Sequence, residues 1–496
     1  MITWGISANS HDAALAVFEY KSGTWDLLFA SHSERFSGVK NDEHLNTQLI
    51  DYARQWGDPD EVIWYERPAI KTLRQFRAGQ GLRLAENNIS RYLGSYGIHA
   101  PIRYIDHHRS HAAAGFYTSG FKDACVVVID SIGEFDTLTI WDGKDNTLTP
   151  TFRQKYPHSV GLWYSALTQR VGLKPQEDEY ILMGMAAYGD PTRLYHDMKQ
   201  DFISLTGNGP AVKINQNLHR GCMDWRPDLT TEQDMFDIAA AAQYVYEDIL
   251  RWIVGKTSQQ SSSKNLVLMG GCALNCSANH ITKEYYDNVW IMPNPGDAGS
   301  AIGCVLAHKQ QHIQLDNAYL GYNIKGDYPV EQLTNELLST GIAGVANGRA
   351  EFGPRAFGNR SLLADPRGTD IKSRVNDIKQ RQQFRPFAPV VLEEHAASIF
   401  DGHYNNYMQF TAICKYPDLY PAITHVDATS RVQTVPNDGS GIRKLLERWY
   451  DATGCPMLLN TSLNIKGKPM VNDLTDAAEF EKEYGVKVFC TTAAPE

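Results

Sequence analysis

The sequence repeats one structural unit, which consists of a strand, a short polar loop, a second strand and a hairpin turn. The predicted strands are rich in apolar residues and lie at residues 2–7, 13–18 and 25–30 in the first copy and at 124–130 and 137–141 in the second. The loops Ala8–Asp12 and Ser131–Glu134 join the first two strands of each copy, and hairpin turns are predicted at 21–24 and 142–144. We therefore predict an internal duplication of the architecture.

Two such units are typical of the duplicated ribonuclease-H-like halves of actin, the sugar kinases and the chaperone ATPases, in which paired loops bind phosphates from two sides. Two ordinary hairpins with surface acids would give the same pattern. A helical run at 238–252 is followed by a buried strand at 266–269 and then by Gly270 and Gly271. This order favours the duplicated fold, because a double glycine at a helix start lets a nucleotide approach the backbone.

Two histidines lie four residues apart in an alanine-rich segment that we predict to be helical. His107 and His111 would project from one face of this helix, which is a spacing typical of metal ligands, whereas His108 would point elsewhere. Two imidazoles fill only half of a coordination sphere, and Asp297, which lies between glycines before a small-residue helix, is the carboxylate that we expect to join them. The alternatives are that the histidines only pack and hydrogen-bond, and that Asp297 caps the helix.

Charge and apolar pattern exclude several classes of protein. The net charge is −10, which argues against sequence-independent binding of DNA or RNA, because such binding needs a positive field. No apolar run approaches the length that spans a bilayer, and the first residues lack the layout of a secretory signal, so we expect a cytoplasmic protein of two or three domains. The eight cysteines are scattered and are expected to be reduced, and Cys272 and Cys276 lack the second Cys/His pair that would indicate zinc.

Longer motifs run along most of the chain. In its first part they are His11-Asp12, Glu34-Arg35-Phe36-Ser37, His107-His108-x-x-His111, Asp130-x-x-Gly133-Glu134, the segments 183–189 and 270–275, and 293–297. In its second part they are the Gly- and Arg-rich segment 348–361, Lys379-x-Arg381, the segments 385–389, 425–427 and 431–435, and Ser462-x-Asn464. In these motifs the chain resembles the NodU/CmcH family of ATP-dependent O-carbamoyltransferases. The first part is similar to TsaD-type tRNA-threonylcarbamoylation proteins and the second to YrdC-type domains.

The resemblance implies an α/β fold in which a duplicated ribonuclease-H-like, TsaD-like domain at residues 1–340 precedes a smaller YrdC-like α+β domain at residues 341–496. The second domain would make carbamoyl adenylate and pyrophosphate from carbamoyl phosphate and ATP. The first would pass the carbamoyl group to a hydroxyl of a small-molecule acceptor, such as a sugar, a natural product or a hydroxymethyl nucleotide. The implied cofactors are ATP with Mg(II), and Fe(II) at the metal site. No polymeric nucleic acid or membrane partner is expected, and a homodimer is the default expectation.

The resemblance also assigns roles to residues. The catalytic candidates are His11, Asp12, Arg35 and Lys40, the metal ligands are His107, His111, Asp130 and Asp297, and the nucleotide-binding candidates of the first domain are Gly133, Glu134, Gly270, Gly271 and Asn275. The candidates for binding carbamoyl phosphate and nucleotide in the second domain are Arg349, Arg355, Lys379, Arg381, Arg385, Arg431, Ser462 and Asn464.

Each of these roles has a plainer alternative. His11 is the candidate general base, although a histidine that caps a loop would look the same. Arg35 and Lys40 would neutralise a leaving adenylate. The cations of the second domain suit a phosphate site because they alternate with Gly, Pro and Phe, whereas a solvated basic face is the alternative. Ser462 and Asn464 could equally form a turn after a buried strand.

The chain departs from the family pattern at Ser131, where a glycine is usual, and at Ile181, where a basic residue is expected, and its tail is short. Two other functions remain open: a tRNA threonylcarbamoyl-type transferase, and an actin- or DnaK-like ATPase that acts as a conformational switch. The acidic balance disfavours the first. The second leaves Lys379-x-Arg381 and Ser462-x-Asn464 without a role. Arg74, Arg77, Arg83 and Arg91 would suit a phosphorylated acceptor, or else belong to a solvated helix.

Overall fold

The computed structural model describes residues 1–77, 79, 81 and 83–491. The chain forms two compact units: unit 1 contains residues 1–33 and 41–316, and unit 2 contains residues 34–40 and 317–496. The division therefore falls earlier than the boundary predicted after residue 340. The reason is that β13 (Tyr319–Ile324) pairs with β15 (Gly348–Glu351), and α11 (Val330–Thr340) packs on α14 (Gly441–Thr453).

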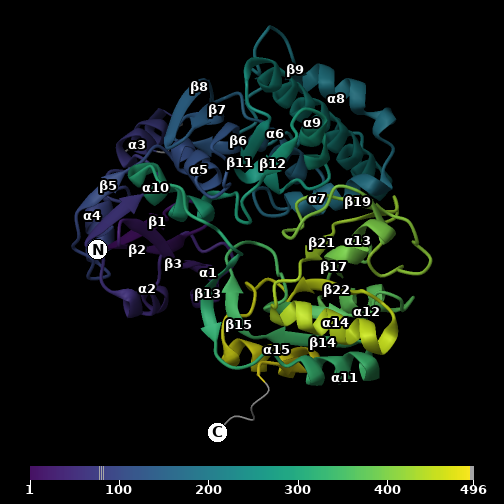
Figure 1. Ribbon diagram of the computed structural model, residues 1–496. Helices are drawn as coiled ribbons and strands as arrows, with labels where there is room; N and C mark the ends of the chain where they lie inside the picture. The colour runs from purple at the N-terminus through teal and green to yellow at the C-terminus, as the bar shows by residue number, and fades with distance from the viewer. Residues whose placement is uncertain (78, 80, 82, 492–496) are drawn as a thin grey trace. The chain divides into compact units, whose positions relative to one another are not determined.

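Unit 1 contains two five-stranded sheets with the same topology (Figure 1). The first has the order β3-β2-β1-β4-β5, and the second has the order β8-β7-β6-β11-β12. In each sheet the first strand of the copy is central, the next two strands run antiparallel on one side, and the last two run parallel on the other. The strands are β1 (Ile2–Ser7), β2 (Ala14–Lys21), β3 (Thr24–His32), β4 (Glu61–Trp64), β5 (Ile102–Tyr104), β6 (Asp123–Gly133), β7 (Asp136–Lys144), β8 (Thr147–Lys155), β11 (Asn265–Met269) and β12 (Asn288–Trp290). This confirms the predicted duplication and the α/β class.

Most of the predicted strands are found, with ends that move by a few residues. The turn predicted at 142–144 is wrong, because these residues pair within the β6–β7 ladder and the chain reverses at Asp145 and Asn146 instead. Asp145 has a φ of +50°, which aspartate tolerates better than most residues. The central strands β1 and β6 are buried along most of their length.

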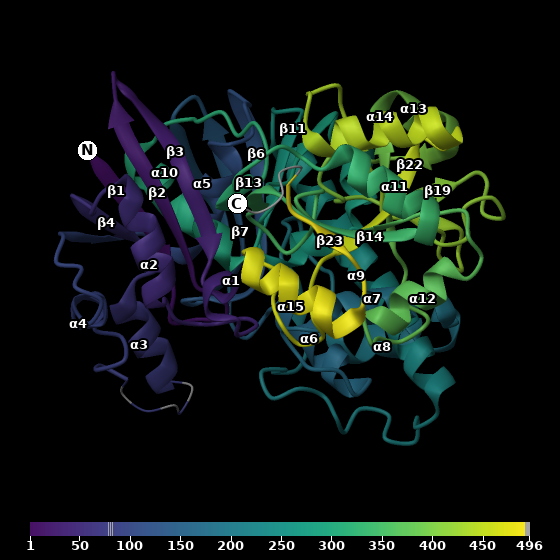
Figure 2. The same ribbon diagram turned by 90° about the horizontal axis from the view of Figure 1, so that it is seen from below.

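Two helices connect the halves of unit 1 by exchange (Figures 1 and 2). The helix α5 (His107–Phe116) follows the first sheet but packs on β6 and β11 of the second, whereas α10 (Ser300–Lys309) follows the second sheet and packs on β1 of the first. The two helices also pack on each other. This close approach requires glycine, because a Cβ at Gly303 would lie 1.9 Å from the Ser110 carbonyl oxygen. The N-terminal turns of α5 and α10 therefore meet.

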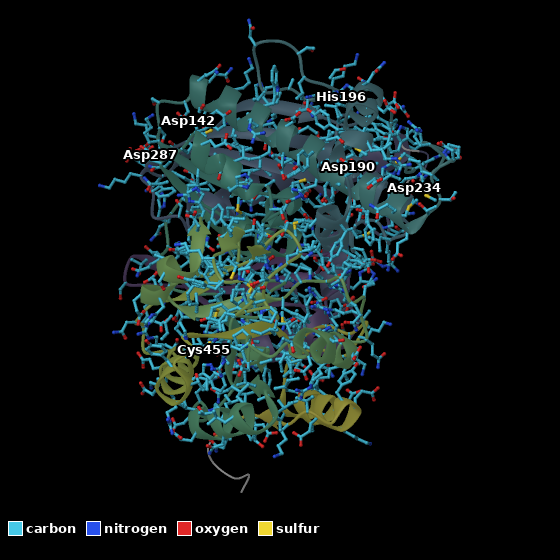
Figure 3. All side chains as sticks on the ribbon, turned by 90° about the vertical axis from the view of Figure 1, so that its right-hand side faces the viewer. Asp142, Asp190, His196, Asp234, Asp287 and Cys455 are labelled. Carbon is cyan, nitrogen blue, oxygen red and sulfur yellow. The ribbon has the colours of Figure 1, made fainter. Side chains whose placement is uncertain are left out.

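The remaining part of unit 1 is mainly helical. It contains α2 (Thr47–Ala53), α3 (Pro68–Arg77), α4 (Ile89–Gly94), α6 (Val160–Arg170), α7 (Glu179–Met185), α8 (Tyr195–Phe202) and α9 (Glu232–Gln260). The helix predicted around 238–252 is confirmed as part of α9, which begins at a capping box of Thr231 and Asp234. Asp190 and Asp234, both labelled in Figure 3, lie in this helical part, where Arg193 forms ion pairs with Asp234 and Asp237.

Unit 2 is built on a mixed six-stranded sheet with the order β21-β17-β22-β16-β14-β23. Its strands are β14 (Ile342–Ala346), β16 (Arg360–Ala364), β17 (Ala388–Leu392), β21 (Gln433–Val435), β22 (Met457–Ser462) and β23 (Val488–Phe489). Its helices are α11, α12 (Ile371–Ile378), α13 (Glu393–Ile399), α14 and α15 (Leu474–Tyr484), and a small sheet joins β18 (Phe400–Gly402), β19 (Ala412–Cys414) and β20 (Thr429–Ser430). The core of this unit includes Trp449 and Cys455, of which Cys455 is labelled in Figure 3.

The segment Glu34–Lys40 joins unit 2 although its neighbours in the chain belong to unit 1. It contains the short helix α1 (Glu34–Ser37). Arg35 is 3% exposed and donates from Nη2 to the Gly353 carbonyl oxygen at 3.1 Å, and the Phe36 ring packs edge-on against Tyr322. No helix in the part of the chain that the structure describes is long and apolar enough to cross a membrane.

Candidate active site

Four side chains from three separate segments form a compact group in unit 1. His107 and His111 come from the first turns of α5, Asp130 from the end of β6, and Asp297 from the turn Asp297–Gly299 just before α10. The candidate ligand atoms lie within 4.8 Å of one another. The His107 Nε2 atom lies 3.1 Å from His111 Nε2, 3.5 Å from Asp130 Oδ2 and 3.4 Å from Asp297 Oδ1, and His111 Nε2 lies 3.2 Å from Asp297 Oδ1. The fold therefore brings together the four side chains that were predicted as metal ligands.

The local fold explains why these side chains converge. The exchange of α5 and α10 places their N-terminal turns at one edge, where β6 also ends. Gly133 leaves room for the imidazole, since a Cβ there would lie 2.1 Å from His107 Cδ2. Asp297 makes no capping hydrogen bond at the start of α10, and its carboxylate faces the two histidines instead. The helix-cap alternative for Asp297 therefore does not describe this structure.

The chemistry of this group fits a divalent transition metal. The four residues are largely buried, with His107 at 2% and His111 at 0% exposed, and a pair of buried carboxylates needs compensating positive charge. Burial raises the pKa of Asp297, but His107 and His111 outweigh it and hold that pKa well below its usual range. Two imidazole nitrogens and two carboxylates that converge on one point suit zinc, iron or manganese. His108 lies outside the group, and its Nδ1 is 2.9 Å from Thr139 Oγ1.

The first loop carries the pair His11 and Asp12. The His11 Nδ1 atom lies 3.4 Å from Asp12 Oδ2. Burial lowers the pKa of His11, but the hydrogen bond and charge of Asp12 outweigh it and raise the pKa to about 9. The imidazole is therefore protonated in the free protein at neutral pH. In that state it suits an anionic group, and it must first lose a proton to act as a general base.

The second loop holds Glu134 in an unusual backbone conformation. Its φ of +58° lies in the left-handed region, which is uncommon for a residue with a Cβ. The Arg67 backbone N–H donates to Glu134 Oε1 at 2.6 Å, and burial raises the pKa of this carboxyl to about 7. A buried carboxyl that titrates near neutrality is a feature of functional sites.

The double glycine positions a candidate metal ligand. Gly270 has a φ of +90°, and a Cβ there would lie 2.2 Å from the Ile129 carbonyl oxygen. The Gly271 backbone N–H donates to Asp130 Oδ1 at 3.0 Å. The Asn275 side chain donates to Gln243 Oε1 at 2.9 Å. The glycines are thus explained by close packing on β6, and nucleotide binding at Gly133, Glu134, Gly270, Gly271 and Asn275 stays a prediction.

In unit 2 the motifs Lys379-x-Arg381 and Ser462-x-Asn464 meet. The Lys379 ammonium donates to the Ser462 carbonyl oxygen at 2.5 Å, to Ser462 Oγ at 3.2 Å and to Asn464 Oδ1 at 2.5 Å. Lys379 is 8% exposed, so the solvated-face alternative does not describe it. Burial lowers the pKa of Lys379 well below its usual range, and the charges of Arg381, Arg385 and Lys40 lower it further. An anion here would lie close to several cations.

Lys40 and Arg35 are placed differently from their prediction. We expected them beside the transfer site of the first domain, but both belong to unit 2. Lys40 is exposed and lies near enough to Lys379 to lower its pKa, whereas Arg35 is buried against Gly353. The reason is the excursion of residues 34–40 into unit 2. Their catalytic role stays a prediction, now attached to the second unit.

Several arginines of the Gly- and Arg-rich segment bind backbone oxygens. Arg349 donates to the Leu320 carbonyl oxygen at 2.5 Å, and Arg355 donates to those of Tyr407 and Met408. Arg360, a third cation of this segment, is fully buried and donates to the carbonyl oxygens of Tyr322, Asn347, Gly348, Asn359 and Asn472. These contacts shape the segment, so that phosphate binding by Arg349 and Arg355 stays a prediction.

Arg381 and Arg431 differ from these three. Arg381 donates from Nε to Asn376 Oδ1 at 2.6 Å, and its guanidinium lies 4.1 Å from the centre of the Phe387 ring. The Nε of Arg431 is buried and has no hydrogen-bond partner among the described residues. An Nε–H in that position suits a ligand.

The two departures have little direct effect on these groups. The Ser131 carbonyl oxygen accepts a hydrogen bond of 2.5 Å from Ser159 Oγ, which anchors the start of α6 beside the second loop. Ile181 is 6% exposed within α7, where its side chain contributes to the core.

Sequence reasoning missed a buried ion pair beside the first loop. Lys71 and Glu66 lie five residues apart, a spacing that carries no known signal, and α3 resembled a solvated helix. The available signal was the apolar strand that ends at Trp64, because Glu66 and Arg67 follow it closely and would be placed near the buried core.

The sequence matches two family models in order. These are Carbamoyltransferase N-terminus over residues 64–306 and Carbamoyltransferase C-terminus over residues 334–493. The chain is 32% identical to an uncharacterised protein of Synechocystis sp., over 95% of this chain and 93% of that protein. It is 30% identical to the nodulation protein NolNO of Sinorhizobium fredii, over 91% and 74%. It is 26% identical to the 3'-hydroxymethylcephem-O-carbamoyltransferase of Amycolatopsis lactamdurans, over 96% and 95%.

Similarity to solved structures is low. Component A of the Acidaminococcus fermentans (R)-2-hydroxyglutaryl-CoA dehydratase gives a TM-score of 0.36 at 13% identity, over 62% of this chain and 99% of that one. Full-length HypF in its phosphate- and nucleotide-bound form gives 0.35 at 13% identity, over 62% and 46%. The two family models and the relatives that align over most of their length confirm the prediction from the motifs: the chain belongs to the carbamoyltransferase family of the NodU/CmcH type and is a carbamoyltransferase.

Proposed function

We propose that this carbamoyltransferase makes carbamoyl adenylate in unit 2 and transfers its carbamoyl group in unit 1 to a hydroxyl of a small-molecule acceptor. The observation that carries the proposal is the convergence of Lys379 with Ser462 and Asn464 beside Arg381. The motif of Lys379 and the motif of Ser462 and Asn464 are more than 80 positions apart in the chain, and they meet around the buried Lys379 ammonium group. The relatives support the acceptor class, since one is named as an O-carbamoyltransferase of a hydroxymethyl group.

In unit 2 the proposed reaction is the formation of carbamoyl adenylate from two anionic substrates. Carbamoyl phosphate first loses its phosphate to water, which gives carbamate and inorganic phosphate. A carbamate oxygen then attacks the α-phosphorus of ATP, bound with Mg(II), and pyrophosphate leaves. Both substrates are polyanions, so Lys379, Arg381, Arg385 and Lys40 would hold them by charge, and Ser462 and Asn464 would orient the carbamate by hydrogen bonds. A YrdC-like fold for unit 2 is part of this proposal.

The chemistry of unit 1 is transfer to oxygen. The acceptor hydroxyl attacks the carbamoyl carbon, the hydroxyl proton passes to a base, and AMP leaves with the electrons of its bond to carbon. His107, His111, Asp130 and Asp297 would hold a divalent ion, which we propose to be Fe(II), and such an ion supplies Lewis acidity.

His11 has two possible tasks in this step. Protonated beside Asp12, it would stabilise the phosphate of AMP as it leaves. Deprotonated, it would accept the proton of the acceptor hydroxyl. The raised pKa favours the first task in the resting enzyme.

The test separates this enzyme from an ATPase switch. Purified protein is incubated with ATP, Mg(II) and Fe(II), with and without carbamoyl phosphate, and pyrophosphate, AMP, ADP and phosphate are measured. We expect pyrophosphate only with carbamoyl phosphate, and its loss in Arg381→Ala. Arg374→Ala is the matched control, because Arg374 lies on α12 but is exposed and pairs with Asp370. ADP release that ignores carbamoyl phosphate would overturn the proposal and favour the switch.

The acceptor class is tested next. Glucosamine, a 3'-hydroxymethylcephem and a hydroxymethylated pyrimidine nucleotide are supplied in parallel. A tRNA with an unmodified acceptor adenosine is supplied in a fourth reaction, together with threonine and bicarbonate. Carbamate ester on one of the small molecules is the expected result. Modification of the tRNA alone would replace the proposal by the tRNA-directed activity.

A further inference from the structure

A buried ion pair between Lys71 and Glu66 contacts the backbone of the first loop of unit 1, which contains residues 8–13. The Lys71 ammonium, on α3, donates to Glu66 Oε1 at 2.6 Å and to the Asn9 carbonyl oxygen at 2.5 Å. Lys71 is 5% and Glu66 4% exposed. The ammonium is therefore removed from water and joins a carboxylate to the backbone of the loop that carries His11 and Asp12.

The backbone of Asn9 is held from two sides in a left-handed conformation. Its φ is +60°, which asparagine adopts more readily than most residues with a Cβ. Its N–H donates to the Glu43 carbonyl oxygen at 2.7 Å, while its C=O accepts from Lys71. Both backbone groups of Asn9 are thus fixed two residues before His11, which sets the direction in which the chain presents the imidazole.

A second, partly buried Lys–Glu pair in the same unit provides a comparison, with side-chain exposures of 12% for Lys309 and 11% for Glu61. Lys309, at the end of α10, pairs with Glu61, which begins β4, whereas Glu66 follows the end of the same strand. The parallel register of β1 and β4 pairs Thr3 with Glu61, so that this pair lies at the start of β1 and the loop at its end. Lys309 and Glu61 therefore form a Lys–Glu ion pair at the opposite end of the strands from the first loop.

Buried ion pairs rarely increase stability, because the loss of hydration offsets the attraction between the charges. An apolar pair would fill the space beneath the loop at no greater cost, but it could not donate to the Asn9 carbonyl oxygen. We propose that Lys71, held in place by Glu66, is a positioning residue for carbamoyl transfer, which fixes the first loop so that His11 and Asp12 face the transfer site. This inference rests on the proposed function and adds to it a residue pair outside the motifs of the family.

The positioning role affects only one half of the reaction. Lys71→Ala removes the donor to Asn9, and we expect carbamoyl transfer to fall about 100-fold, the cost of a displacement of about 1 Å in an active site. The loss should lie in kcat, with the KM for the acceptor changed less than threefold. Carbamoyl-phosphate-dependent pyrophosphate release in unit 2 should remain within twofold of wild type.

Chemical rescue distinguishes positioning from general damage. Propylammonium replaces the atoms that Lys71→Ala removes, and its ammonium group can again donate to Asn9 and Glu66. We expect it to restore at least a tenth of the lost transfer rate and to protect the amides of residues 8–13 from hydrogen exchange. Propanol, which lacks the charge, is the matched additive and should do neither.

Lys309→Ala is the matched variant. It should lower the melting temperature about as much as Lys71→Ala but leave both transfer and the exchange of residues 8–13 unchanged. Equal loss of transfer in both variants, or unchanged transfer and loop exchange in Lys71→Ala, would overturn the positioning role. Wild-type protein that makes no pyrophosphate from carbamoyl phosphate would instead overturn the proposed function, and the amide exchange of the two variants would still decide whether Lys71 positions the loop.

Discussion

The two sheets of unit 1 share one topology but differ in the connection between their first two strands. In the first sheet β1 ends at Ser7 and β2 begins at Ala14, which leaves a loop of six residues. In the second, β6 runs through a bulge to Gly133 and β7 begins at Asp136, so that the turn contains only Glu134 and Phe135. The duplication is thus preserved in the strands and lost in the loops.

This difference divides the site between the halves. The long loop presents an imidazole and an acid that are still partly exposed, with side-chain exposures of 34% for His11 and 26% for Asp12. In the second half, Asp130 near the end of β6 and Glu134 in the tight turn are both buried, and Asp130 belongs to the candidate metal group. A single ancestral connection can therefore serve two purposes, because strand pairing does not depend on what the loop contains.

The largest predicted effect is a difference in metal affinity between variants of the acids of the two loops, Asp130 and Asp12. Asp130→Ala removes a candidate metal ligand, and we expect the affinity for Fe(II), Mn(II) or Zn(II) to fall by more than about 100-fold, since even the loss of an outer partner of a ligand costs 10–100-fold. Asp12→Ala changes the acid of the first loop and should leave the metal affinity within about threefold. Titration calorimetry with the metal alone measures both. Equal affinities in the two variants would contradict the assignment of Asp130.

His108→Gln is a further control on the same helix. His108 is buried beside His107 but bonds to Thr139, so that its replacement should leave metal stoichiometry unchanged. A loss of metal in this variant would mean that packing of α5, rather than ligation, determines the binding.

The next effect concerns the exchanged helices that join the halves. Gly303→Ala would place a Cβ 1.9 Å from the Ser110 carbonyl oxygen, so α5 and α10 must separate. We expect a loss of about 3 kcal/mol in unfolding free energy, with weaker metal binding, because α5 carries His107 and His111 and Asp297 lies just before α10. Gly209→Ala is the control, since a Cβ there meets nothing within 4 Å. Denaturant titration would show the difference, and equal stability of the two variants would reject the close packing.

Sequence reasoning reached the duplicated strands and three of the candidate metal ligands, His107, His111 and Asp297, from local patterns, whereas the family resemblance supplied Asp130. The runs of apolar residues marked β1 and β6, and the spacing of His107 and His111 marked one face of α5. Asp297 was found because glycines on both sides of an acid are unusual before a helix. Convergence of such segments follows from the fold once its topology is known.

Other features depend on long-range packing and leave no local pattern. The destination of Arg35 and Lys40 in unit 2 depends on contacts with residues more than 300 positions away. The ion pair of Lys71 and Glu66 depends on the path of the first loop, and the arginines at 349 and 355 show charge in the sequence but not the backbone oxygens that they bind. The missed turn at Asp145 reflects β7, which continues beyond its last large apolar residue.

A third prediction sharpens the contrast between the turns by pH. Burial raises the pKa of Glu134 from 4.5 to about 7, so the folded protein binds more protons than the unfolded chain between these values. Unfolding free energy should therefore fall as the pH rises from 4.5 to 7, by about 2 kcal/mol. Glu134→Gln should remove this part of the slope. Melting temperatures of both proteins across this range are the measurement, and parallel curves would contradict the shift.

The smallest effect belongs to the more exposed loop. Burial lowers the pKa of His11, but Asp12 outweighs it and raises the pKa from 6.5 to about 9, so stability should decline as the pH rises through this window. Solvent screening makes the decline weaker than that of Glu134. His11→Gln should flatten the curve between pH 6.5 and 9. Below pH 6.5 it should lower the stability by a constant amount and leave the slope unchanged. A wild-type curve that is already flat in that window would contradict the raised pKa.

The excursion of residues 34–40 has a consequence for synthesis on the ribosome. Arg35 and Phe36 leave the exit tunnel early, but Tyr322 and Gly353, which cover them, are made much later. Until then a cationic and aromatic segment remains exposed to solvent. Nor can one cut in the chain separate the two units cleanly, because a break after Asp316 leaves the segment attached to the wrong piece. A version of unit 2 made on its own would therefore have to include residues 34–40.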